Sequence, residues 1–114
     1  LMLGVDGMIV SNHGGRQLDP GQSTIRPLAE LVKEFKGKTT LMMDSGIRTG
    51  PDIAATLATG ADFVFLGRTP MYGVCALGQF GGHHTLTMLK RQLQQVMEQV
   101  ACEQVEDFPN HLIA

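Results

Sequence analysis

The chain has no tryptophan, one tyrosine and only two cysteines, and its acidic residues slightly outnumber its basic ones. Cys75 and Cys102 are too few and too far apart for a disulfide framework or a CxxC metal site, so we expect reduced thiols and no bound metal. A net charge of −2 argues against the basic face that nucleic-acid binding requires. The sequence has neither an apolar run long enough to cross a bilayer nor a recognisable signal peptide, so we expect a cytoplasmic protein with no membrane span.

What the sequence does contain is short apolar runs separated by glycine-containing loops. Of the 114 residues 43% are apolar, enough to form the core of one small domain, and 14 are glycine. Apolar runs predict strands at 5–10, 40–43 and 61–66, and helical spacing predicts helices at 25–35, 51–59 and 82–101. Continuously apolar strands that alternate with helices are typical of a parallel sheet buried on both faces, so we predict an α/β fold.

A polar cluster follows each predicted strand. SNHGGRQLD (11–19) follows the first strand, DSGIR (44–48) the second and GR (67–68) the third. In barrels and open α/β sheets the active site lies at the carboxyl ends of the strands. Each cluster alone is compatible with an ordinary turn, but one cluster per consecutive strand predicts a shared site.

The residue types in these clusters suit a small carboxylate and a phosphate. His13 can accept a proton near neutral pH, and Arg16 can bind a carboxylate through two parallel hydrogen bonds. Glycines of the later clusters, together with Arg48, Arg68 and the N-termini of the following helices, are typical of an anion cradle. Asp44 would repel a phosphate, so we expect it to accept hydrogen bonds from the loop or from cofactor hydroxyls.

Three stretches, SNHGGRQLD, DSGIRTGPDI and FLGRTPMYG, resemble the C-terminal portion of the FMN-dependent 2-hydroxy-acid oxidising family. That family includes glycolate oxidase, L-lactate dehydrogenase, lactate oxidase and mandelate dehydrogenase, and the resemblance covers essentially the whole chain. It implies a fragment of a (β/α)₈ TIM barrel that corresponds to strands six to eight with their helices. It also implies the oxidation of an L-2-hydroxy acid to the 2-oxo acid, with FMN as the cofactor.

The resemblance assigns a role to each position of the motifs. His13 would be the catalytic base, and Arg16 would hold the substrate carboxylate. Eight residues would contact FMN: Ser11, Asp44, Ser45, Gly46, Ile47, Arg48, Gly67 and Arg68. The common family motif is DGGVR, with glycine where this chain has Ser45. The DSG form resembles the membrane-associated lactate and mandelate dehydrogenases, which adds the inner face of a membrane as an alternative location.

A complete barrel typically needs about 250 residues. We therefore expect residues 1–114 to be one incomplete domain, the C-terminal segment of the barrel, with two unpaired sheet edges and an exposed barrel-interior face. By itself the chain should lack turnover, because the N-terminal part of the barrel is missing, and the parent enzyme is expected to be a homo-oligomer.

Two alternative functions stay open at this point. The chain could be a half-barrel module that assembles with a partner chain. It could also belong to another phosphate-binding barrel enzyme, such as an FMN-dependent isomerase, although SNHGGR is not expected there. The residues leave open which 2-hydroxy acid is used, which acceptor reoxidises the flavin, and whether His13 takes the proton from the α-carbon or from the hydroxyl.

Overall fold

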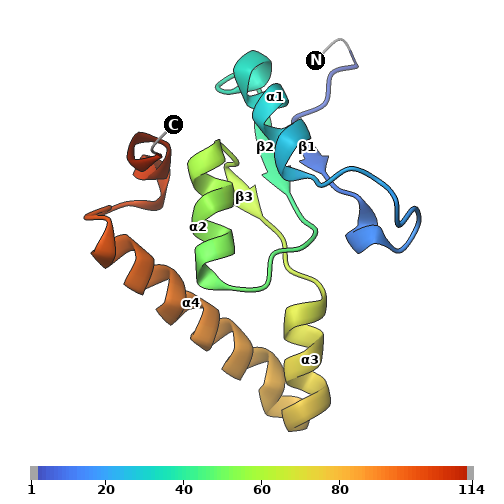
Figure 1. Cartoon of the computed structure of the whole chain (residues 1–114), viewed down its shortest axis with the longest axis vertical. Helices are drawn as coiled ribbons and strands as arrows, with labels where there is room; N and C mark the ends of the chain where they lie inside the picture. Colours follow the sequence, from blue (N-terminus) through green and yellow to red (C-terminus); the bar gives the residue numbers. More distant parts are fainter. Residues whose placement is uncertain (1–2, 113–114) are drawn as a thin grey trace.

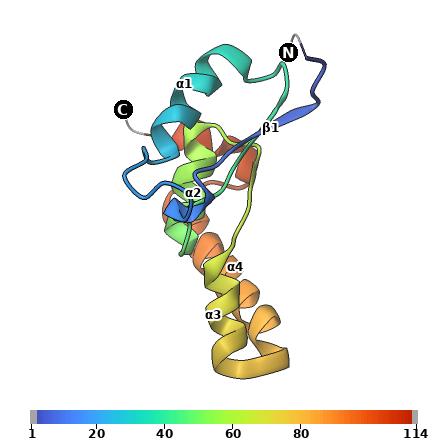
Figure 2. The same ribbon diagram turned by 90° about the vertical axis from the view of Figure 1, so that its right-hand side faces the viewer.

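The computed structural model describes residues 3–112 of the chain. Three parallel strands form one sheet in their sequence order, β1 (Gly7–Val10), β2 (Thr40–Met43) and β3 (Phe63–Val64). Helices α1 (Ile25–Phe35) and α2 (Gly50–Thr59) connect the strands and lie on the same side of the sheet (Figures 1 and 2). This repeated strand–helix order confirms the predicted α/β fold.

A helical hairpin follows the sheet. Helix α3 (Arg68–Leu77) extends away from the strand ends, a 3₁₀ turn (Gly78–Phe80) reverses the chain, and α4 (Gly81–Gln99) runs back along α2 (Figure 1). A last 3₁₀ segment (Val105–His111) also packs against α2. Helix α3 was not predicted from the sequence, and none of its residues is buried in the described structure.

The core lies between the sheet and the helices. Leu28 of α1, Leu41 of β2 and Leu89 of α4 are fully buried. The other core members come from β2, from α2 and the loops on either side of it, and from the C-terminal segment: Met43, Ile47, Ile53, Ala54, Leu57, Ala61, Cys102 and Phe108. Because one contiguous cluster joins all these elements, the described residues form a single structural unit.

The other face of the sheet is not covered. Side chains alternate between the two faces of a strand, and the register places Ile9, Met42 and Phe63 in one row across the three strands. In that row Ile9 is 53% and Phe63 55% exposed. The prediction of a sheet buried on both faces is therefore wrong for the described residues, whereas the expectation of one exposed apolar face is confirmed.

Strand lengths follow from the pairing. The first strand begins at Gly7 rather than at residue 5, since its partner begins opposite it at Thr40. The third strand is shorter than the predicted 61–66, although its ladder is extended by the N–H groups of Asp62 and Phe65, which donate to the carbonyls of Leu41 and Met43. Within the described residues β1 and β3 each pair on one side only, as expected for unpaired edges.

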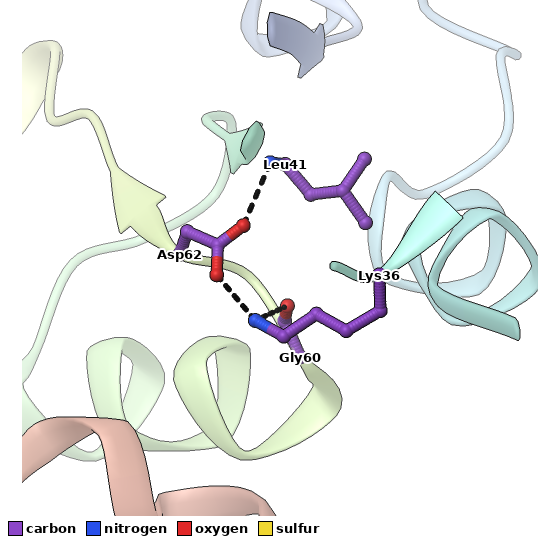
Figure 3. Close-up of polar contacts among 4 residues, drawn as sticks. All are labelled: Lys36, Leu41, Gly60 and Asp62. Carbon is purple, nitrogen blue, oxygen red and sulfur yellow. Dashed lines mark hydrogen bonds and ion pairs between the residues drawn. The ribbon is translucent and has the colours of Figure 1, made fainter. Parts of the chain in front are cut away.

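Asp62 holds the amino-terminal end of this sheet together (Figure 3). Its Oδ2 accepts a 2.9 Å hydrogen bond from the Leu41 N–H, and its Oδ1 pairs with Lys36, whose Nζ also donates to the Gly60 carbonyl at 3.0 Å. Partial burial opposes ionisation, but the hydrogen bonds from Leu41 and Lys36 outweigh it and hold the pKa of Asp62 below its ordinary value. One carboxylate thus links α1, β2 and β3.

Candidate functional site

A cavity of about 440 Å³ opens at the carboxyl ends of the three strands. All three predicted clusters meet there. Nine of the ten predicted site residues line it: His13, Arg16, Asp44, Ser45, Gly46, Ile47, Arg48, Gly67 and Arg68. The tenth, Ser11, is not part of the cavity lining, and its Oγ accepts a 3.1 Å hydrogen bond from the His13 N–H. The topology therefore brings together residues that are more than 50 positions apart in sequence.

The first loop carries both His13 and Arg16. A short 3₁₀ turn over His13–Gly15 is capped by Asn12, whose Oδ1 accepts a 3.2 Å hydrogen bond from the Gly15 N–H. His13 has a φ of 55°, a left-handed conformation that costs a non-glycine residue free energy and clusters at functional sites. Both the imidazole-bearing residue and Arg16 are exposed at the cavity, so both side chains are accessible to a ligand.

The second loop is tied to the first by Ser45. Its Oγ accepts hydrogen bonds from the N–H groups of Asn12 and Gly14, both at 3.2 Å, and donates to Asp44 Oδ1 at 2.6 Å. Ser45 and Gly46 both have a left-handed backbone, with φ of 80° and 76°. Asp44 thus accepts a hydrogen bond from the loop, which is one of the two arrangements expected for it.

Helix α2 begins directly after this loop in the sequence, and the N–H groups at its start already donate hydrogen bonds within the protein. Asp52 Oδ2 accepts from the N–H groups of Arg48 and Thr49 at 3.0 and 2.9 Å, and Thr49 Oγ1 accepts from the Asp52 N–H, which completes a capping box. Partial burial raises the pKa of the Asp52 carboxyl, but these hydrogen bonds outweigh that effect and hold the pKa below its ordinary value. The Gly50 N–H donates to Gln92 Oε1 of α4 at 2.9 Å. This helix end therefore offers an anion fewer free donors than its sequence indicates.

The N-terminus of α3 is more open. Its N-cap is Gly67, which makes no side-chain capping bond, and Gly67, Arg68 and Thr69 all line the cavity. A Cβ added at Gly46 or at Gly67 would meet no atom within 4 Å, so both glycines face open space. Two such glycines, a helix N-terminus and the guanidinium groups of Arg48 and Arg68 fit a phosphate, because N–H groups, dipole and positive charge converge.

Several cavity residues were not predicted. Six residues without a predicted role complete the lining: Gly14, Gln17, Phe65, Leu66, Thr69 and Met71. Phe65 and Met71 are exposed apolar side chains and add an apolar wall to a site that was predicted mainly from polar residues and glycines. Thr69 and Met71 lie in FLGRTPMYG, one of the stretches that carry the resemblance, and that stretch was the available signal for them.

A histidine, three arginines and several glycines gathered at the carboxyl ends of parallel strands are typical of an α/β enzyme site. Comparison with known proteins agrees with that class. Residues 1–114 match the family model of the FMN-dependent dehydrogenases. The chain belongs to this family, and the family is FMN-dependent.

Relatives of known activity share about two fifths of their aligned residues with the chain. A peroxisomal (S)-2-hydroxyacid oxidase of Arabidopsis thaliana is 42% identical over 110 residues, which are 96% of this chain and 30% of the oxidase. An L-lactate dehydrogenase of Yersinia pestis is 40% identical over 111 residues, or 97% and 29% of the two chains. The chain thus spans about a third of the length of the curated relatives it matches.

Solved structures confirm the fold. A soluble mutant of the membrane-associated (S)-mandelate dehydrogenase of Pseudomonas putida superimposes with a TM-score of 0.88 and 40% identity, over 95% of this chain and 31% of that one. A structure described as the monotopic membrane protein (S)-mandelate dehydrogenase gives a TM-score of 0.89. The three-stranded unit is therefore similar to part of that TIM-barrel enzyme. Among residues 3–112, no helix has the length and apolarity to cross a bilayer.

Proposed function

We propose that this chain forms one wall of the active site of an enzyme that oxidises an L-2-hydroxy acid to the 2-oxo acid with FMN. The observation that supports the proposal is that His13, Arg16 and the glycine–arginine cradle line one cavity. For this reaction the protein must supply a base for the substrate proton, a group that binds the substrate carboxylate, and a site for the phosphate of FMN. The nearest rival within barrel enzymes, an FMN-dependent isomerase, would not explain the His13–Arg16 pair.

The substrate end of the cavity is assigned to the first loop. Arg16 binds the substrate carboxylate and thereby orients the α-carbon, and His13 accepts the proton that leaves the substrate. Both side chains are on one short turn, so the distance between carboxylate and base is set by local backbone geometry. When bound, FMN supplies the acceptor for the two electrons. Holding the reactants in register contributes the proximity effect, worth up to about 7–11 kcal/mol in favourable reactions.

The cofactor phosphate is assigned to the other two loops. Gly46 and Gly67 leave room for close approach of the backbone, and Arg48 and Arg68 supply charge. The N-terminus of α3 adds its dipole, whereas the donors at the start of α2 are already paired. Ser11, Asp44 and Ile47 stay assigned to the surroundings of the flavin. A phosphate next to Arg68 would share that guanidinium with the Gly14 carbonyl.

Residues 1–114 are assigned to the C-terminal segment of the barrel, corresponding to strands six to eight. The exposed row that contains Ile9 and Phe63, and the unpaired edges of β1 and β3, support a requirement for further strands. The same features also suit a module that assembles with a separate chain. In both cases the 114 residues alone should show no turnover, and the enzyme formed around them is expected to be a homo-oligomer.

The test is anaerobic flavin reduction by the complete protein that contains this chain. Mixing with L-lactate, glycolate or (S)-mandelate should bleach the oxidised flavin absorbance with at least one substrate. His13→Gln should retain FMN and lose most of the reduction rate, and Arg16→Lys should raise KM more than it lowers kcat. Absence of bound FMN, or a flavin that none of these acids reduces, would overturn the proposal. Adding FMN and lactate to the 114-residue chain tests its expected inactivity.

A further inference from the structure

The hydroxyl of Ser45 has no hydrogen-bonding capacity left for a ligand. A serine hydroxyl offers one donor and two acceptor positions. Ser45 Oγ accepts from the N–H groups of Asn12 and Gly14 and donates to Asp44 Oδ1, which uses all three. Any contact between Ser45 and a cofactor would therefore come from its backbone, and the side chain serves the first loop.

The backbone conformation at Ser45 is unfavourable for a serine. With φ at 80°, the residue has a left-handed conformation in which glycine is favoured and a Cβ is strained. The common family motif noted above has a glycine at this position, whereas the DSG form has a serine. A serine here is disfavoured by its backbone, and the three hydrogen bonds of its hydroxyl offset that cost. Two of them end on the loop that carries His13.

The two accepted hydrogen bonds flank His13. They come from the residues immediately before and after it, Asn12 and Gly14, and His13 itself has a strained φ of 55°. The Arg68 guanidinium also donates a 2.8 Å hydrogen bond to the Gly14 carbonyl. The direction of the imidazole therefore depends on a backbone segment that Ser45 holds at both ends.

We propose that Ser45 is a positioning residue for His13. Its hydroxyl fixes the 12–14 backbone so that the imidazole faces the substrate. Because the same hydroxyl donates to Asp44, the position of that backbone also depends on the position of Asp44. This inference rests on the proposed function, in which His13 is the base. Arg16 lies beyond the pinned segment, so loss of the hydroxyl should affect proton removal more than carboxylate binding.

The experiment uses two variants of the complete FMN-loaded protein. Ser45→Gly removes the hydroxyl and the backbone strain together, and Ser45→Ala removes the hydroxyl but keeps the Cβ. Ser23→Ala, an exposed serine outside the cavity lining, is the matched control. Hydrogen exchange of a peptide spanning residues 11–17, FMN affinity, the flavin reduction rate, and the isotope effect with α-deuterated substrate are measured on each.

In both Ser45 variants the amide hydrogens of residues 12–14 should exchange faster than in the parent protein. The FMN affinity of both variants should stay within about threefold of the parent affinity. The reduction rate should fall by about 10²-fold, as a misplacement of 1 Å can cause, with a larger isotope effect and a small change in KM. Unchanged exchange in both variants overturns the proposal, as does a loss of FMN affinity at a normal reduction rate. Recovery of the parent rate in Ser45→Gly alone would assign the effect to strain and also overturn it. If the parent protein reduces no flavin, the proposed function fails, and the exchange data still report whether Ser45 holds the loop.

Discussion

The guanidinium of Arg68 donates a 2.8 Å hydrogen bond to the carbonyl of Gly14, which lies 54 residues earlier in the chain. This contact joins the start of α3 to the His13 loop across the cavity. Gly14 and Arg68 both belong to proposed ligand-binding segments. A shift of either segment should therefore change the position of the other through this hydrogen bond.

Gly14→Ala should disrupt this contact. An alanine Cβ would lie 2.8 Å from Arg68 Nη2, and Gly14 has a φ of +66°. We expect destabilisation of about 1–3 kcal/mol from backbone strain and, in the complete protein, weaker FMN binding because Arg68 is displaced. Denaturant unfolding and FMN titration measure the two effects. Gly37→Ala is the control, since Gly37 has a φ of +79° with open space around it, and it should lose stability but keep FMN affinity. Equal FMN affinity in both variants would contradict the prediction.

Thr49→Ala should weaken the start of α2. It removes the acceptor of the 3.2 Å bond from the Asp52 N–H and breaks the capping box. Loss of a threonine N-cap costs about 1 kcal/mol. Urea denaturation should show a lower midpoint with an unchanged slope. Thr59→Ala, at the other end of the same helix, is the control and should cost less, and an equal loss at both sites would argue against a capping role.

Acid should destabilise the unit through Asp52 and Asp62. The pKa of each carboxyl is lowered in the folded state from an ordinary value of 3.8, although burial opposes the effect. Because the unfolded chain binds protons more readily, the contribution to stability is complete above pH 3.8 and is lost as pH falls through the folded-state values. Unfolding free energies measured down this range should fall, and Asp62→Asn should reduce the dependence. An identical acid slope in that variant would exclude Asp62 as a contributor.

Gly81→Ala should separate the helices of the hairpin. A Cβ at this position would lie 2.0 Å from the Gly73 carbonyl oxygen, so the two helices can pass at this distance only with glycine between them. Overpacking of this kind costs about 1–3 kcal/mol, and the shift of α3 should weaken FMN binding through Arg68. Gly82→Ala is the neighbouring control. Its Cβ meets nothing within 4 Å, and it should stabilise α4 by up to about 1 kcal/mol. Thermal unfolding of both variants tests the contrast, and equal melting temperatures would contradict it.

Elements with strong local patterns were predicted well. Helix 25–35 and strand 40–43 have their predicted bounds because apolar spacing and burial coincide there. Helix α3 was missed, because Pro70 and Gly73 are poor helix formers and weaken its local pattern. Its apolar residues, among them Met71 and Tyr72, are exposed in the described structure.

The sequence by itself determined the order of strands and helices, the chemistry at each strand end and the family to which the chain belongs. These depend on local patterns and on residue identity. Only the tertiary structure decided how that chemistry is held. The bonds from Asn12 and Gly14 to Ser45, from Gly50 to Gln92 and from Arg68 to Gly14 join residues 31 to 54 positions apart. Such contacts depend on how elements pack, and no local pattern encodes which donor meets which acceptor across that separation.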